Sequence, residues 1–210
     1  ETDLNDSDPM VTALTYASFL GTMQDNGVEI FTPWSWGDGM YETVHLFSRY
    51  GHPNRVESVS SNDSLVSGYS SISNAGDSLT VIFVNRAESA AQNVELSLKN
   101  FKVNPGEVTT LTLSELKGET FVSHTQNALQ KGSLQVSADG KASLSLKAKS
   151  ITAVMFATNE PEAPIKTSKI LAENILNYKD GKWVVQNSSG QVFEALIFNC
   201  LGKQVKTQKL

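Results

Sequence analysis

The chain has 210 residues, a formal net charge of −5 and 40% hydrophobic residues, values typical of a soluble globular protein of one or two domains. It contains no apolar stretch of about 18 residues, so the sequence predicts no membrane-spanning helix. Only three arginines occur, and they form no basic stripe suited to nucleic acid. The single cysteine, Cys200, excludes an intrachain disulfide framework and a cysteine-rich metal site.

Residues 1–52 begin with the pattern of an amphipathic helix. Asp8 is the expected N-cap, and Pro9 suits the first helical position because its fixed φ fits a helix and its missing N–H is not needed there. Apolar residues then recur at helical spacing, at Met10, Leu14, Ala17 and Leu20. Asn26 and Gly27 form the expected C-terminal end.

A strand and a second helix follow the first. The run VEIFTPW, residues 28–34, predicts a nearly continuous apolar strand, and SWGDG predicts a turn. The second helix is expected over MYETVHLFSRY and ends at Gly51. The order helix, strand, helix indicates a fragment of an α/β fold with a parallel sheet.

From residue 53 the sequence changes to short β-rich segments separated by turn residues. Apolar and polar residues alternate clearly in NVELSLKNF and KASLSLKA, as in half-buried antiparallel strands. The predicted strands are RVESVSS, SLVSGYSSI, SLTVIFVNR, QNVELSLKNF, EVTTLTL, ETFVSH, GSLQVSAD, KASLSLKAK and SITAVMFAT. Together they predict an antiparallel β-sandwich over residues 53–158.

The remaining residues divide into a linker and a small tail. Two prolines among polar residues in NEPEAPIKTS indicate a linker over residues 159–169. Residues 170–210 add strand-like segments in ILNYKDGKWVVQNSS, QVFEALIFN and KQVKTQ. This β-rich tail is too short to form a large core of its own.

Residues 1–157 resemble the C-terminal part of the enzymes of glycoside hydrolase family 44, which are endo-acting β-1,4-glucanases and xyloglucanases. The resemblance is carried by FLGTMQDNGVEIFTPWSW, HLFSRYG, SVSSNDSLVSGYSSISNAGDSLTVIFVNR and SITAVMF. It implies a C-terminal fragment of a (β/α)8 TIM barrel over residues 1–52, followed by the antiparallel β-sandwich. The tail, with ALIFNCLGKQV, resembles bacterial C-terminal secretion and sorting domains, which implies a secreted or cell-surface protein.

The family's chemistry requires two carboxyl groups about 5 Å apart, one of them a nucleophile. Gapless matching to the family pattern places Glu1 at the nucleophile position; the alternative is an exposed terminal carboxylate. The acid/base residue has no counterpart here. Because a complete barrel needs about 250 residues, and the chain starts without an initiator methionine or signal peptide, we expect most of the barrel upstream of residue 1. The chain alone is therefore predicted not to hydrolyse glucans and to need an accompanying N-terminal barrel portion.

The resemblance assigns substrate contacts to the loop that follows the predicted strand. Trp34 matches the aromatic floor of the sugar site, where a ring face packs on pyranose C–H groups; barrel core is the alternative. Trp36 is a second predicted substrate contact, with interface packing as the alternative. Asp38 and Tyr41 are predicted to contact sugar hydroxyls, unless Asp38 is the N-cap of the second helix and Tyr41 a turn residue.

Other candidate residues are interpreted structurally. His45 is expected to be a structural histidine with its hydrogen bonds satisfied, and Cys200 a buried small hydrophobe. Alternation with polar residues places most of the aromatic residues of the β-rich region inside the sandwich, namely Tyr69, Phe83, Phe101, Phe121 and Phe156. No metal-ligand spacing is found, and no metal or cofactor is predicted.

The leading hypothesis is the C-terminal part of a secreted retaining glycoside hydrolase acting on cellulose, xyloglucan or mannan-like polysaccharide. The alternative is a non-catalytic carbohydrate-binding or structural β-sandwich module.

Overall fold

The computed structural model describes residues 6–28, 30–33, 36–117 and 121–161, and the backbone of four strands between residues 174 and 209. The chain divides into two compact units, Glu1–Ile165 and Lys166–Leu210, and each is described by itself. Glu1, Trp34 and Cys200 lie outside the described residues, so the predictions for them remain predictions.

The first helix, α1, spans Pro9–Asp25 and confirms the predicted ends. The Asp8 side chain accepts a hydrogen bond from the Met10 backbone N–H at 2.9 Å, which satisfies one of the donors that a helix start leaves free. Asn26 is the C-cap, and Gly27 follows with a φ of +70°, a conformation that favours glycine.

The second predicted helix consists of two parts. An α-helix, α2, spans Met40–His45, and a π-helical turn, η1, continues it over Leu46–Tyr50. Gly51 ends the turn as predicted, and its N–H donates to the Phe47 carbonyl oxygen at 3.2 Å.

Residues 54–157 form the two sheets of a sandwich. One sheet has six strands in the order β1-β2-β3-β8-β5-β6, and the other pairs β4 with β7. The strands are β1 Asn54–Val56, β2 Val66–Ile72, β3 Ser78–Asn85, β4 Gln92–Ser97, β5 Gly106–Leu113, β6 Gln130–Val136, β7 Lys141–Leu146 and β8 Ser150–Ala157. All of their pairings are antiparallel, as predicted for this region.

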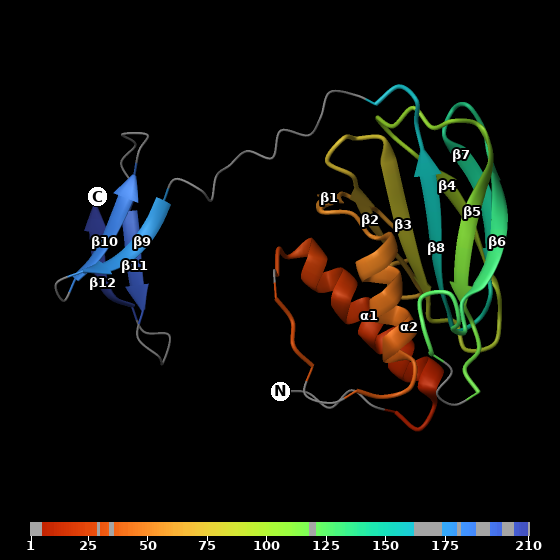
Figure 1. The fold of residues 1–210 in the computed structure, drawn as a ribbon, viewed down its shortest axis with the longest axis horizontal. Coiled ribbons are helices and arrows are strands. Elements are labelled where there is room, and N and C mark those ends of the chain that lie inside the picture. Colours follow the sequence, from red (N-terminus) through yellow and green to blue (C-terminus); the bar gives the residue numbers. More distant parts are fainter. Residues whose placement is uncertain are drawn as a thin grey trace. The chain divides into compact units, whose positions relative to one another are not determined.

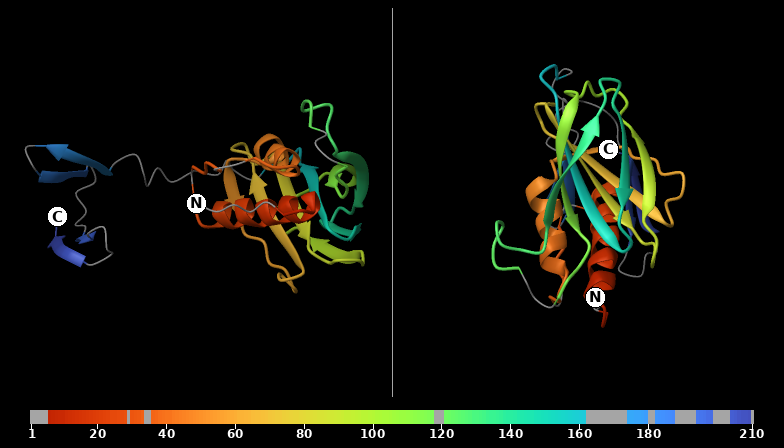
Figure 2. Two further views of the ribbon diagram at one scale, coloured as in Figure 1. Left: turned by 90° about the horizontal axis from the view of Figure 1, so that it is seen from below. Right: turned by 90° about the vertical axis from the view of Figure 1, so that its right-hand side faces the viewer.

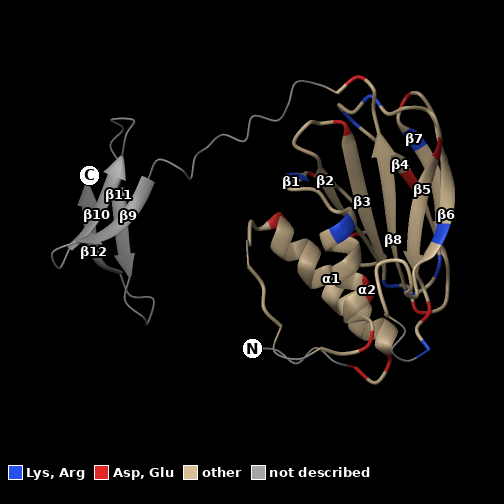
Figure 3. Cartoon of the chain, in the orientation of Figure 1, with Lys and Arg blue, Asp and Glu red and all other residues tan. Residues whose placement is uncertain are grey.

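The six-stranded sheet is covered on both faces, by the helices on one side and by β4 and β7 on the other (Figures 1 and 2). Alternate residues of β3 show this directly. Leu79, Val81 and Phe83 belong to the core under β4 and β7, while Ile82 and Val84 belong to the core under α1. Figure 3 shows that the central strands β3 and β8 carry no charged residue along their length.

The prediction of a strand over residues 28–34 is wrong for its described residues. Residues 28 and 30–33 have no strand conformation, and Val28 and Ile30 are 47% and 81% exposed. Phe31 packs against α1, with its ring 5.4 Å from that of Phe19. An extended segment becomes a strand only when a neighbour pairs with its backbone groups, and none pairs with these residues in the described part of the chain. The predicted parallel sheet is therefore not seen there.

The predicted strand ETFVSH is also wrong in its described part. Residues 121–129 lie in the loop between β5 and β6, where a single bridge joins Ser123 and Gln126. Phe121 consequently packs outside the sandwich, contrary to the prediction. Phe83 and Phe156 lie in the sandwich core as predicted, Phe101 packs against it, and Tyr69 faces the helices.

The second unit contains two β-hairpins. Strands β9 Asn174–Lys179 and β10 Lys182–Asn187 pair antiparallel, as do β11 Glu194–Phe198 and β12 Gln204–Lys209. These strands match the segments predicted from the sequence. No helix in the described part of the chain has the length and apolar character needed to cross a membrane.

Candidate functional site

Three aromatic rings form a row beside α2. Trp36 stacks on Tyr41 with ring centroids 5.4 Å apart and an interplanar angle of 24°. Tyr41 in turn stacks on Phe121 at 6.1 Å and 24°. Trp36, at the end of the row, is 48% exposed. We call Trp36, Tyr41 and Phe121 the aromatic row.

The backbone around Gly39 sets the direction of this loop. Gly39 is the N-cap of α2 with a φ of +90°, which a residue with a side chain rarely adopts. A Cβ added there would lie 2.5 Å from the Pro9 carbonyl oxygen, so the loop passes directly against α1. Asp38 precedes the cap, so the alternative in which Asp38 is the N-cap of the second helix is wrong, because Gly39 holds that position.

Glu42 attaches the loop between β5 and β6 to α2. It is 1% exposed, the one buried carboxylate among the described residues, and its Oε1 accepts a hydrogen bond from the Ala128 backbone N–H at 3.4 Å. A buried carboxylate is stabilised only by such partners. Glu42 therefore serves to hold the loop that carries Phe121, a role that the sequence pattern did not reveal.

His45 closes the far end of the aromatic row. Its ring makes edge-to-face contacts with Phe121 at 5.4 Å and with Tyr50 at 5.5 Å. Burial lowers the pKa of His45, an effect partly opposed by a hydrogen bond to the His124 backbone. Among the described residues its buried Nε2 finds no hydrogen-bond partner, so the prediction of a fully satisfied histidine is wrong there.

The structure brings together some of the predicted site residues. Trp36 and Tyr41 lie in direct contact, and Asp38 is a half-buried turn residue on the same loop. Phe121 was assigned to the sandwich by its sequence neighbours, and only the tertiary packing places it beside Tyr41.

In the described part of the chain, no group of His, Cys, Asp and Glu residues could hold a metal ion. Aromatic faces with an exposed end are suited to stacking on the apolar face of a ligand ring.

A groove runs along the outward face of α1. Its volume is about 490 Å³, and its wall is formed by Val11, Leu14, Thr15, Ser18, Phe19, Thr22, Arg86, Glu88 and Lys149. The apolar members lie on α1, while Arg86 and Lys149 border the groove from the sheet. Lys149 also contacts Asp8 at 3.2 Å and Glu88 at 3.0 Å, which ties the helix start to the sandwich. An apolar helix face left open in this way is a surface that another polypeptide could cover.

No protein-family model and no curated protein matches the sequence. Solved structures do match. A bifunctional glucanase-xylanase from a metagenome library superposes with a TM-score of 0.57 and 20% identity over 71% of this chain and 28% of its own. A glycoside hydrolase family 44 endoglucanase from Clostridium thermocellum superposes with a TM-score of 0.58 and 14% sequence identity. The match covers 70% of this chain and 29% of the endoglucanase. An α-L-arabinofuranosidase from Thermotoga maritima superposes with a TM-score of 0.60 and 13% sequence identity. The match covers 75% of this chain and 41% of the arabinofuranosidase.

These similarities concern the fold. The chain shares a partial glycoside hydrolase fold, with few helices and mostly antiparallel sheets, and it spans less than half the length of each of these enzymes. The three enzymes act on different glycans by name, so the shared fold does not choose among substrates.

Proposed function

We propose that this chain is the C-terminal part of a secreted retaining glycoside hydrolase of the endo-β-1,4-glucanase type. The observation that carries the proposal is the match of about 70% of the chain to part of a family 44 endoglucanase and of a glucanase-xylanase. The half-exposed end of the aromatic row supports it, because glucan rings are bound through aromatic faces. Secretion is proposed from the sequence of the tail alone.

In this proposal the aromatic row forms one wall of the sugar-binding cleft. Tyr41 supports the Trp36 ring from one side, and the exposed part of Trp36 packs against the C–H face of a pyranose. Trp34 is the neighbouring platform in the same loop, and Asp38 contacts sugar hydroxyls. Tyr41 thus acts on sugar mainly through Trp36.

The carboxylate pair is completed by polypeptide outside this chain. Glu1 is proposed as the nucleophile, and the acid/base residue belongs to the accompanying N-terminal barrel portion. That portion covers the α1 groove and the exposed Val28 and Ile30. The length of the matched enzymes supports this assignment, because more than half of each has no counterpart here.

The alternative is a non-catalytic carbohydrate-binding or structural module. The exposed end of the aromatic row supports binding without hydrolysis equally well, since stacking needs no carboxylate pair. The two functions differ in what the full-length protein does to a soluble glucan.

The test compares the full-length protein with the 210-residue chain on carboxymethyl cellulose, xyloglucan and mannan. We expect reducing ends from the full-length protein only, and a more than tenfold loss of that activity when Glu1 is replaced by Gln. Affinity electrophoresis then measures binding of Trp36→Ala, with Val59→Ala as the matched control, because Val59 is 88% exposed and distant in sequence from the row. A full-length protein that binds glucan without hydrolysing it would refute the proposed hydrolase activity and support the binding module. Hydrolysis by the 210-residue chain would refute the proposal that its catalytic site is incomplete.

A further inference from the structure

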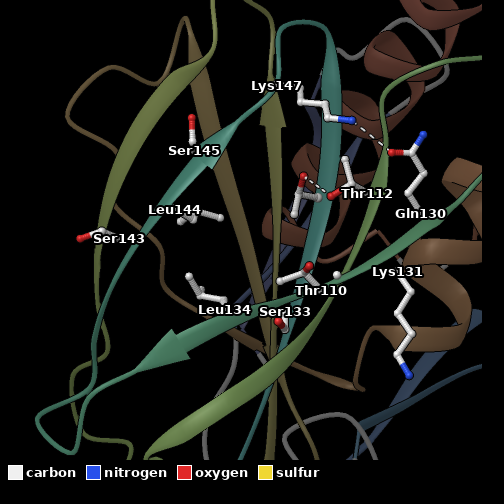
Figure 4. Close-up of a pocket in the computed structure, with 12 residues that line it drawn as sticks. Thr110, Thr112, Gln130, Lys131, Ser133, Leu134, Ser143, Leu144, Ser145 and Lys147 are labelled. Atoms are coloured by element: carbon white, nitrogen blue, oxygen red, sulfur yellow. Dashed lines mark hydrogen bonds between the residues drawn. The ribbon is translucent and has the colours of Figure 1, made fainter.

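The sandwich contains a cleft at the end opposite the turn that joins β6 and β7. Its volume is about 340 Å³, and it opens between these two strands, with β5 and β8 as its floor (Figure 4). The strands β6 and β7 leave their connecting turn close together, and Lys147 marks the other end, where they have separated. The cleft lies within the sandwich and contains none of the residues of the aromatic row.

The floor of the cleft departs from the pattern of a sandwich core. Inward-facing residues of packed sheets are normally apolar, and one end of this sheet obeys that rule with Val108 opposite Leu134. Two residues further along the same face, Thr110 lies opposite Gly132, and Thr112 is paired with Thr152. The Thr112 and Thr152 hydroxyls are 3.1 Å apart.

Gly132 keeps this floor open. A Cβ at that position would lie 2.9 Å from the Thr110 Oγ1, closer than side chains normally approach. Any larger residue at position 132 would therefore fill the space above the threonine. Three hydroxyls and a glycine on the inner face contribute little to a hydrophobic core, and such departures from folding rules are expected at functional sites.

Lys147 lies across the mouth of the cleft. Its Nζ donates to the Gln130 Oε1 at 3.1 Å and contacts the Ser114 Oγ at 3.5 Å, both neutral groups. Figure 4 shows Lys147 reaching toward Gln130, whereas Lys131 extends away from Lys147. No Asp or Glu lines the cleft, and no carboxylate in the described residues pairs with Lys147. Lys147 thus places a cation without a carboxylate partner in the described residues at the mouth of the cleft.

We propose that this cleft binds a sugar acid, a saccharide unit with several hydroxyls and one carboxylate. The threonine hydroxyls of the floor and the Gln130 amide exchange hydrogen bonds with the sugar hydroxyls. Leu134 and Leu144 contact the C–H face of the ring, and the Lys147 ammonium binds the carboxylate. A volume of about 340 Å³ lies in the range of small-molecule sites.

This inference is independent of the proposed function, because the cleft is complete within the described residues of the sandwich. The test is titration of the isotope-labelled 210-residue chain, followed by amide NMR shifts, with glucuronate, glucose and sulfate as separate ligands. We expect saturable shifts with glucuronate, confined to β5, β6, β7 and β8, and at least tenfold weaker binding of glucose and of sulfate.

Variants connect the binding to the cleft. We expect Lys147→Met to weaken glucuronate binding at least tenfold and Thr112→Val to weaken it at least fivefold. Lys99→Met is the matched control, because Lys99 is also exposed and without an ion pair in the described residues, and its affinity stays within twofold of the wild type. Three results would overturn the proposal: no saturable shift, equal binding of sulfate or of glucose, or unchanged affinity in Lys147→Met.

Discussion

Substitution of Gly21 by Ala is expected to destabilise the unit that carries the aromatic row. Gly21 lies in the last third of α1, over the ring of Tyr69 on β2. A Cβ at this position would lie 2.4 Å from three ring atoms, including Cγ at the fixed base of the ring. Carbon atoms pack best at about 3.5–4.0 Å, so the helix and the ring would have to separate by about 1 Å or more.

Two opposing effects determine the size of this change. Alanine is favoured over glycine inside a helix by about 0.8–1.0 kcal/mol. Overpacking a dense core costs about 1–3 kcal/mol, and the upper end applies because Tyr69 has little room to move. Tyr69 is 8% exposed, and its ring centroid lies 6.3 Å from that of Phe47. Its hydroxyl donates a hydrogen bond to the Ser18 carbonyl oxygen at 3.3 Å. The net loss in unfolding free energy is therefore about 2 kcal/mol.

Thermal and urea unfolding of the 210-residue chain measure this loss. A change of about 2 kcal/mol lowers Tm by about 4–8 °C in a unit of this size. Thr22→Ala is the matched control, because Thr22 is exposed on the same helix and reports helix propensity alone. In a Tyr69→Leu background the cost of Gly21→Ala should fall by more than half. Equal or higher stability of Gly21→Ala, or an unchanged cost in that background, would refute the close-packing argument.

Further predictions concern pH, the helix start and the loop. Burial lowers the pKa of both His45 and His52, so the unfolded chain takes up protons first and stability should decrease as the pH falls below about 6.5; unfolding of His45→Gln and His52→Gln between pH 5 and 8 should show a smaller decrease, and an unchanged pH profile in both would contradict this. Asp8→Ala removes the cap of α1 and should cost about 1 kcal/mol in chemical unfolding, whereas Asp8→Asn, which retains a capping oxygen, should cost less. Glu42→Gln should destabilise the loop that Glu42 holds through the Ala128 N–H and increase amide exchange at residues 121–129, and protection equal to the wild type would exclude that anchoring role.

Local signals in the sequence were sufficient for most of the secondary structure. Asp8 and Pro9 mark a helix start by hydrogen bonding and by fixed φ, which depend on neighbouring residues alone. Period-two alternation likewise identified strands such as β4 and β7, in which exposed residues alternate with less exposed ones. The failures arose where conformation depends on distant partners. Residues 28–34 have the composition of a strand, yet their described residues find no neighbour to pair with.

The candidate site was only partly visible in the sequence for the same reason. Trp36 and Tyr41 are close in the chain, and their contact follows from a tight turn. Phe121 reaches the site on the loop between β5 and β6, which Glu42 of α2 anchors, and no local pattern indicates either contact. The cleft was also hidden, because threonines in alternate positions of a strand are typical of a solvent-facing side.

The double covering of β3 and β8 has a consequence for how this protein can be divided. Ile82, Val84, Ile151 and Ala153 would be laid bare on a sheet face if the helices were removed, since all four lie in the core under α1. A fusion protein that begins at β1 would expose this apolar sheet face to water and should aggregate or bind chaperones. We therefore expect a fusion within this unit to fold only if its junction keeps both the helices and the β4–β7 sheet packed on β3 and β8.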